Sequence, residues 1–238
     1  MTSDRPAEAG QRGTPMAFKF RREGDSERLD RIEATLQRMI ADDLHAFELA
    51  MSALLGERSP HEVGAELRAT DHGVNTAERE IRRELIVHAS VQGAIDTPAI
   101  LVYMSIVKDI ERIGDYAKNL FDLAADGADL STGMHTGEIT SLAREVPEFL
   151  TAAAETFQDR DDDRAKSLLR DGDVLLDRFD ARVSELVRDE HPDQQAVAVA
   201  LTHRYLKRIV AHGMNVLSAV VMPVDRLDYF DEDPEDRS

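Results

Sequence analysis

The sequence predicts an all-α fold of six helices, arranged as two tandem three-helix bundles that are related by internal duplication. Three observations support this prediction. Apolar residues recur at steps of three or four along long segments, which is the period of a helix that buries one face. No stretch keeps the period-two alternation of a half-buried strand. A polar pattern in the first half of the chain also returns in the second half, which indicates two copies of one unit.

In the first half, helices are predicted over residues 26–54, 59–90 and 97–127. Gly56 ends the first of these helices. Ser59 and Pro60 open the second, with serine as the N-cap and proline in the first turn, and Thr97-Pro98 open the third in the same way. The second helix is expected to stop where Gly93 interrupts the pattern. The apolar stripe of the first helix consists of Leu29, Ile32, Leu36, Ile40, Leu44, Phe47, Met51 and Leu54.

In the second half, helices are predicted over residues 137–159, 163–188 and 192–221. Pro147 falls inside the fourth pattern, so that helix either kinks there or begins there. Pro223 prevents the last helix from continuing. The expected organisation is a disordered segment over 1–17, a first bundle over 18–128, a second bundle over 129–223 and an acidic disordered tail over 224–238. Met16 is a possible alternative start.

The internal repeat rests on two stretches that agree in order and spacing. Residues Ile106–Leu120 align with Thr202–Val216 at a constant offset. The matched pairs in this stretch are Arg112 with Arg208, Ile113 with Ile209 and Asn119 with Asn215. On the preceding helices the matched pairs are Asp71 with Asp173, Asn75 with Asp177, Glu78 with Asp180 and Ile81 with Val183. Amphipathic helices share apolar positions by chance, but a shared polar pattern indicates duplication.

The composition of the chain excludes several classes of function. The chain has 238 residues, a formal net charge of -18 and no cysteine. Such a charge repels nucleic acid and anionic membrane surfaces, so neither is an expected partner. Without cysteine, disulfides, thiolate metal sites and cysteine catalysis are excluded. No apolar run approaches the roughly 20 residues that cross a bilayer, and the N-terminus lacks a signal-peptide core. We therefore expect a cytoplasmic protein without direct membrane insertion.

Two groups of carboxylates are candidates for a cation site. Glu111 and Asp115 stand one turn apart on one helix face, where their like charges repel. Asp71 and Glu78 share a face of the preceding helix, and the two faces could meet if the helices are antiparallel neighbours. Hard oxygen ligands suit Mg²⁺, Ca²⁺ or Mn²⁺, whereas iron or zinc needs histidine or several clustered metals. The groups that could offset the repulsion are a metal ion, solvent counterions, Arg112, Lys108 and Lys118.

The carboxylates and histidines also have simpler interpretations. In a chain with 32% charged residues, carboxylates one turn apart often belong to a solvated face. His72 and His212 are expected to be ordinary surface or boundary residues. The spacing of Asp42 and His45 gives one acidic-x-x-His step, but a di-iron bundle needs two.

The stretch Asp109–Leu120, which reads DIERIGDYAKNL, resembles the signature of the PhoU family. The D-x-x-x-N-x-x-E run over Asp71–Glu78 is similar to the family's preceding-helix motif, and the two-unit layout covers roughly residues 18–222. The resemblance implies two three-helix bundles, dimerisation, and metal binding through a Glu-x-x-x-Asp motif in each unit. It also implies a restraint on phosphate uptake and phosphate-starvation signalling, through contacts with a phosphate ABC transporter and a membrane sensor kinase.

Only the first unit keeps the full acidic set. The candidate metal ligands carried over from the resemblance are Asp71, Glu78, Glu111 and Asp115. The second unit has Lys207 and Ala211 where the first has Glu111 and Asp115, so no second metal site is expected. The lysine ammonium repels a metal ion and is expected to pair with an aspartate of the preceding helix, Asp173 or Asp177. Tyr116 also stands where the family usually has histidine.

The resulting functional hypothesis is a non-enzymatic regulator of phosphate transport and phosphate-starvation signalling. It would act as a cytoplasmic adaptor, as a homodimer, and with a divalent Mg, Mn, Zn or Fe ion as its possible cofactor. One alternative is an accessory subunit of another phosphate or cation transporter. A second is a carboxylate–metal enzyme in a helical bundle, which would need histidine ligands on several helices. A third is a plain helical scaffold.

Overall fold

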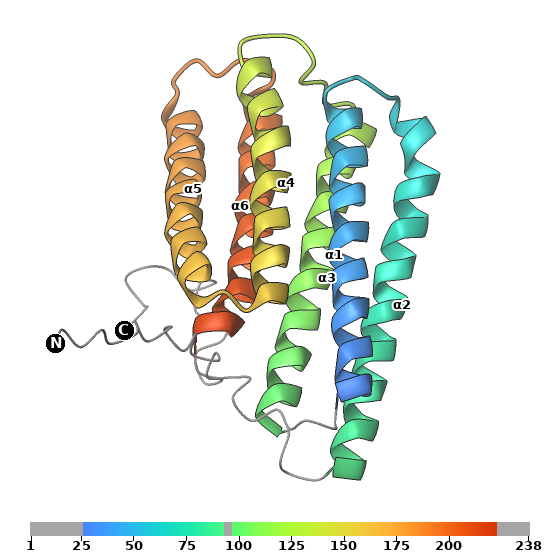
Figure 1. Ribbon diagram of the computed structural model, residues 1–238. Helices are drawn as coiled ribbons and strands as arrows, with labels where there is room; N and C mark the ends of the chain where they lie inside the picture. The colour runs from blue at the N-terminus through green and yellow to red at the C-terminus, as the bar shows by residue number, and fades with distance from the viewer. Residues whose placement is uncertain (1–25, 93–96, 223–238) are drawn as a thin grey trace, which may run out of the picture.

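The computed structural model describes residues 26–92 and 97–222 of this chain, and these residues form six long helices and no strand (Figure 1). The helices are α1 (Ser26–Leu54), α2 (Pro60–Gln92), α3 (Thr97–Ala125), α4 (Thr136–Asp159), α5 (Asp162–Arg188) and α6 (Ala196–Val221). The predicted all-α class is therefore confirmed. None of the described helices is long and apolar enough to cross a membrane.

The sequence signals at the helix ends of the first half act as predicted. Ser59 forms a capping box with Glu62: the Ser59 backbone N–H donates to Glu62 Oε2 at 2.7 Å, and the Glu62 N–H donates to Ser59 Oγ at 3.3 Å. Gly56 and Gly127 follow α1 and α3 with φ values of 68° and 102°, the left-handed region that glycine adopts without strain.

In the second half, α4 decides between two alternatives that the sequence left open, and α6 begins later than predicted. α4 runs from Thr136 through Pro147 without interruption, so a start at Pro147 is excluded. α6 begins at Ala196, four residues after the predicted start. The reason is local, because Asp193 Oδ1 accepts the Gln195 N–H at 2.9 Å and holds the chain in a turn before the helix.

The remaining predictions, which concern the chain ends and the connection between α2 and α3, lie outside the described residues. They are the disordered segments over 1–17 and 224–238, the alternative start at Met16, the bundle limits at 18 and 223, the interruption at Gly93 and the stop at Pro223.

The six helices pack as two groups of three. α1, α2 and α3 contact one another, as do α4, α5 and α6, and the groups meet where α3 packs on α6 and α1 packs on α4. Figure 1 shows the two groups side by side with their long axes roughly aligned. One continuous apolar core runs through both groups. The described packing therefore matches the predicted pair of three-helix bundles.

The α3–α6 contact reflects the internal repeat. At the offset of the repeat, Asp109 corresponds to Tyr205 and Tyr116 corresponds to His212. Asp109 Oδ1 lies 2.9 Å from His212 Nδ1, and the Tyr205 and Tyr116 rings form the equivalent contact at 6.2 Å between centroids. Each contact is thus the counterpart of the other. His212 was expected at the surface or its boundary, but the structure buries it, with 4% of its surface exposed.

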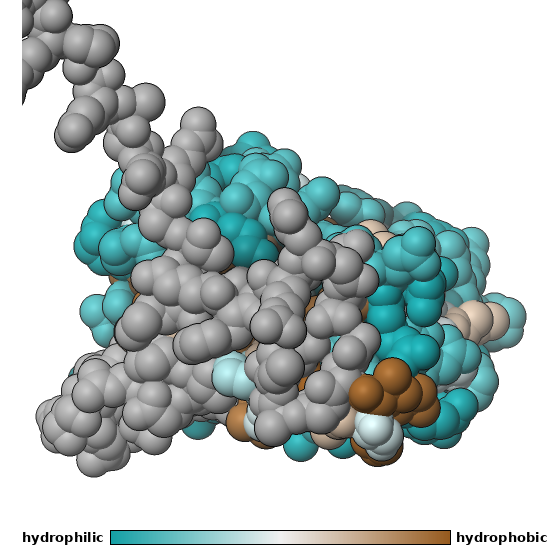
Figure 2. Space-filling view, turned by 60° about the horizontal axis from the view of Figure 1, so that its bottom comes forward, coloured by the Kyte–Doolittle hydropathy of each residue, from teal (hydrophilic) through white to brown (hydrophobic). Residues whose placement is uncertain are grey.

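The part of the surface that is coloured in Figure 2 is mostly hydrophilic. Figure 2 shows the end of the molecule where α2 ends and α3 begins, with hydrophilic residues over most of the coloured surface and a small apolar group at its edge. The exposed large apolar residues near this end of α2 and α3 are Ile86, Val87, Val91 and Leu101.

Candidate functional site

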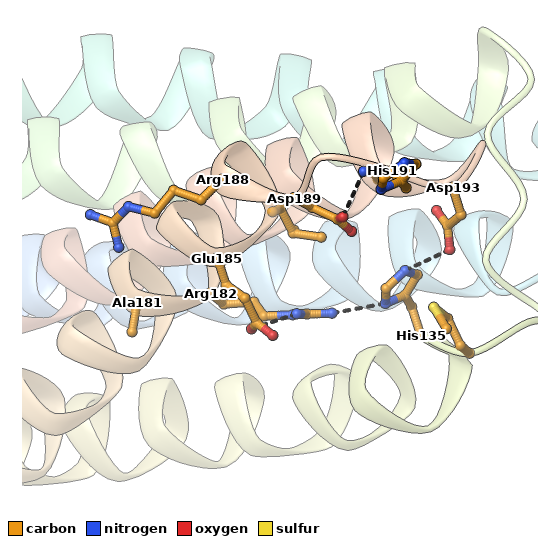
Figure 3. Close-up of a pocket in the computed structure, with 11 residues that line it drawn as sticks. His135, Ala181, Arg182, Glu185, Arg188, Asp189, His191 and Asp193 are labelled. Atoms are coloured by element: carbon orange, nitrogen blue, oxygen red, sulfur yellow. Dashed lines mark hydrogen bonds and ion pairs between the residues drawn. The ribbon is translucent and has the colours of Figure 1, made fainter.

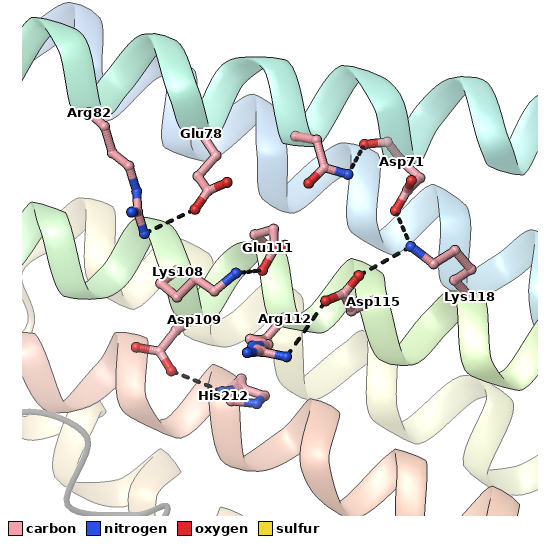
Figure 4. Close-up of polar contacts among 11 residues, drawn as sticks. Asp71, Glu78, Arg82, Lys108, Asp109, Glu111, Arg112, Asp115, Lys118 and His212 are labelled. Carbon is pink, nitrogen blue, oxygen red and sulfur yellow. Dashed lines mark hydrogen bonds and ion pairs between the residues drawn. The ribbon is translucent and has the colours of Figure 1, made fainter.

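The predicted acidic faces of α2 and α3 do meet, because the two helices lie side by side and run in opposite directions (Figure 4). Lys118 of α3 joins them. Its ammonium group donates to Asp71 Oδ1 of α2 at 2.8 Å and to Asp115 Oδ1 of its own helix at 3.2 Å. Asp71 and Asp115, 44 positions apart in the sequence, are thus brought together around one lysine.

The other two predicted ligands are paired within their own helices. Arg82 Nη2 lies 3.0 Å from Glu78 Oε1, four residues earlier on α2. Lys108 donates to Glu111 Oε2 on α3. In this arrangement each predicted carboxylate has a cationic partner, and among the residues that the structure describes no three acidic or histidine side chains converge on one metal position.

The structure adds an acid that sequence reasoning missed. Asp43 of α1 is 1% exposed, and neither of its carboxylate oxygens has a hydrogen-bond partner among the described residues. Burial is the largest cause that raises the pKa of Asp43 well above its usual value, and the negative charges of its neighbours raise it further. These neighbours are Asp42, Glu111, Asp71 and Asp115. Asp43 therefore lies next to the predicted acidic cluster.

A sequence signal for Asp43 existed. Its position is three residues after Ile40 and four before Phe47, both of which are buried, so it falls on the core-facing stripe of α1. The predicted stripe passed through Leu44 instead, which is only partly buried. An acid at a core position is the kind of exception that indicates a functional site.

Gly114 provides the space for this carboxylate. A β carbon built on Gly114 would stand 2.3 Å from Asp43 Oδ1, far inside contact distance. Glycine in the Glu-Arg-Ile-Gly-Asp run thus lets α1 place an acidic side chain directly against the backbone of α3.

The cluster fits a divalent cation in its chemistry. Its donors are hard carboxylate oxygens from three helices, which suit Mg²⁺ or Mn²⁺. Asp43 supplies a buried carboxyl group without a hydrogen-bond partner among the described residues, the kind of group that a cation stabilises. The cluster is made of Asp43, Asp71, Glu78, Glu111 and Asp115, and we refer to these five residues as the acidic cluster.

The second unit lacks such a cluster. Lys207, which corresponds to Glu111, donates to Asp180, which corresponds to Glu78. The predicted partner was Asp173 or Asp177, but the structure shows a pair with Asp180, which lies one turn further along α5 than Asp177. Ala153 stands on α4 where Asp43 stands on α1, between Leu150 and Phe157 of the same apolar stripe.

A second polar region lines a pocket of about 830 Å³ at one end of the second unit (Figure 3). Arg182 donates to His135 Nδ1 at 2.9 Å, so that nitrogen carries no proton and His135 Nε2 donates to Asp193 Oδ2 at 3.0 Å. Arg182 also pairs with Glu138 and Glu185. These groups bond to one another and hold together the ends of α4, α5 and the turn before α6.

Comparisons with known proteins show which domain and fold this chain resembles. Residues 36–124 match the family model of the PhoU domain, a range that includes the whole acidic cluster. A curated protein of Synechocystis sp., the phosphate-specific transport system accessory protein PhoU homolog, is 24% identical over 197 residues, which cover 81% of this chain and 87% of that protein. The crystal structure of PhoU from Pseudomonas aeruginosa has the same fold, with a TM-score of 0.69 and 23% identity over 81% of this chain and 95% of that chain. By these matches, residues 36–124 are similar to the PhoU domain, and the chain has the fold of PhoU over most of its length.

Proposed function

We propose that this protein is a non-enzymatic regulator of phosphate transport and of phosphate-starvation signalling. It acts as a cytoplasmic adaptor and homodimer that binds a phosphate ABC transporter and a sensor kinase. The observation that carries the proposal is the PhoU domain match over residues 36–124, which spans most of α1, all of α2, most of α3 and the acidic cluster. The curated relative's description as a transport accessory protein supports the same role.

Binding to the transporter and the kinase can be tested directly. The full chain, carrying an affinity tag, would be used to capture partners from phosphate-replete and phosphate-starved cells. The proposal expects a phosphate transporter subunit or a sensor kinase among the captured proteins, in amounts that depend on the phosphate supply. Recovery of neither class under both conditions would refute the adaptor role.

The proposed cofactor is one divalent cation, with Mg, Mn, Zn and Fe as the candidates. The residues that would hold it are Asp71, Glu78, Glu111 and Asp115, with Asp43 added from the structure. When bound, the ion would neutralise the repulsion within the acidic cluster and stabilise the packing of α1, α2 and α3. The buried carboxylate of Asp43, which has no partner among the described residues, is the observation that supports this site.

A matched pair of double variants tests the site. Replacing Glu111 and Asp115 by alanine is expected to abolish metal-dependent stabilisation, whereas replacing Asp173 and Asp177 on α5 is expected to leave it nearly unchanged. Both changes remove two negative charges, so the comparison separates ligation from a general loss of charge. Calorimetric titration with each metal measures the effect, and equal losses in both variants would show that the first-unit site is wrong.

A further inference from the structure

Lys118 differs from the other cations around the acidic cluster in what it connects. Its ammonium contacts Asp71 and Asp115 and so links α3 to α2, whereas the Arg82–Glu78 and Lys108–Glu111 pairs each join residues of a single helix. Its side chain is 34% exposed. The ammonium therefore sits at the edge of the cluster, with a path to water along its own flexible stem.

The acidic cluster holds one carboxyl group, that of Asp43, to which neither Lys118 nor another described residue donates a hydrogen bond. An ammonium carries one charge and three donors, while a divalent ion carries two charges and takes six or more oxygen ligands. Lys118 donates hydrogen bonds to Asp71 and Asp115. Both oxygens of Asp43 have no hydrogen-bond partner among the described residues.

The second unit shows how the corresponding helices pack when a lysine takes the place of Glu111. Lys207 stands on α6 at the position of Glu111 and pairs with Asp180. Alanine occupies the two places where the first unit has Asp43 and Asp115. In that unit Lys207 contacts Asp180, whereas in the first unit Lys118 contacts both Asp71 and Asp115.

We propose that Lys118 is a built-in competitor of the metal ion: it holds Asp71 and Asp115 together in the metal-free protein, and a divalent cation must displace it to bind the acidic cluster. The inference rests on the metal binding proposed above and concerns its regulation. Lys118 raises the metal concentration at which the cluster fills, and it keeps α2 and α3 in register when no metal is bound.

The test compares Lys118→Met with the wild type by calorimetric titration with Mn²⁺ alone, after treatment with a chelator. Removing the ammonium while keeping the apolar stem is expected to tighten Mn²⁺ binding by about tenfold or more, since one competing positive charge within a few Å is lost. Without metal, the melting temperature of Lys118→Met is expected to fall, because the contacts to Asp71 and Asp115 are gone.

Two matched variants serve as controls. Lys166→Met removes the same charge from an exposed i,i+4 pair with Asp162 on α5, and Mn²⁺ affinity is expected to stay within about twofold of wild type. Lys118→Arg keeps the positive charge at the cluster and is expected to bind Mn²⁺ no more tightly than wild type. Circular dichroism checks that each variant is folded.

The outcomes separate this inference from the metal site itself. Unchanged Mn²⁺ affinity in Lys118→Met, with binding lost in the Glu111→Ala/Asp115→Ala variant, would disprove competition by Lys118 and leave the site standing. Equal tightening in Lys118→Met and Lys166→Met would reduce the effect to net charge and also disprove it. If neither the wild type nor Lys118→Met binds Mn²⁺, the inference is wrong, and absence of binding with Mg²⁺, Zn²⁺ and Fe²⁺ as well would refute the site; capture of the transporter or kinase remains a separate measurement.

Discussion

Gly114 of α3 faces Asp43 of α1 so closely that a β carbon at residue 114 would stand 2.3 Å from Asp43 Oδ1. The other surroundings of Asp43 leave it little freedom to move, because its side chain is 1% exposed. The glycine is therefore a packing requirement of the buried acid and not a helix breaker, since α3 continues through it to Ala125.

Gly114→Ala is expected to destabilise the protein by about 1–3 kcal/mol, the usual cost of forcing extra volume into a packed site. Urea unfolding measures this change. In the Asp43→Ala background the same substitution is expected to cost much less, because the clashing carboxylate is absent. Additive effects of the two substitutions would show that residue 114 does not contact Asp43.

The pH dependence of stability is expected to reveal Asp43. Its pKa is raised in the folded state, mainly by burial, so the folded protein binds the proton more tightly than the unfolded chain does. Ionisation of Asp43 therefore lowers the free energy of unfolding as the pH rises from about 4, the pKa of an unfolded aspartate, to the raised folded value.

Asp43→Asn removes that ionisation without changing the size of the side chain. With metal chelated, it is expected to increase the free energy of unfolding at pH 7 by about 1 kcal/mol or more, and this gain should disappear near pH 4. Urea unfolding at both pH values checks it. A variant that is less stable than wild type at pH 7, or equally altered at both pH values, would contradict the assignment.

Asp109 is expected to be a main polar contact between the two units. Its Oδ1 accepts from His212 Nδ1 and from Asn215 Nδ2, both at 2.9 Å, and all three side chains are buried. Asp109→Ala leaves these two donors without that acceptor and is expected to cost about 2–4 kcal/mol. Tyr205→Phe, at the equivalent position of the second unit, serves as the control and is expected to cost far less. Similar losses for both variants in urea unfolding would contradict this role.

Arg160 ends α4 with a φ of 55° and reaches across to the first unit, where it contacts Glu33 and lies 3.3 Å from the Tyr103 hydroxyl. Arg160→Ala removes these contacts and keeps a side chain in the left-handed region, whereas Arg160→Gly removes the contacts and relieves that strain. The glycine variant is therefore expected to be more stable than the alanine variant by about 1 kcal/mol. Thermal unfolding of the two proteins decides it, and equal melting temperatures would show that the backbone at residue 160 carries no strain.

The positions of the helices follow from local sequence. Most residues of the acidic cluster could also be proposed from local sequence. Apolar spacing, the Ser59–Glu62 capping box and Gly56 each act within three or four residues, so they can be read without knowing the fold. The shared face of Glu111 and Asp115 follows from the same helical period.

The surroundings of Asp43 and the partner of Asp71 depended on tertiary structure alone. Gly114 lies 71 positions from Asp43, and Lys118 lies 47 positions from Asp71. The periodicity of α1 indicates which residues face inward, but not whether an inward acid meets backbone, a cation or other acids. Those interactions arise only when α1, α2 and α3 pack together, and at such short distances the Coulomb energy and the loss of hydration depend on side chains that are far apart in the sequence.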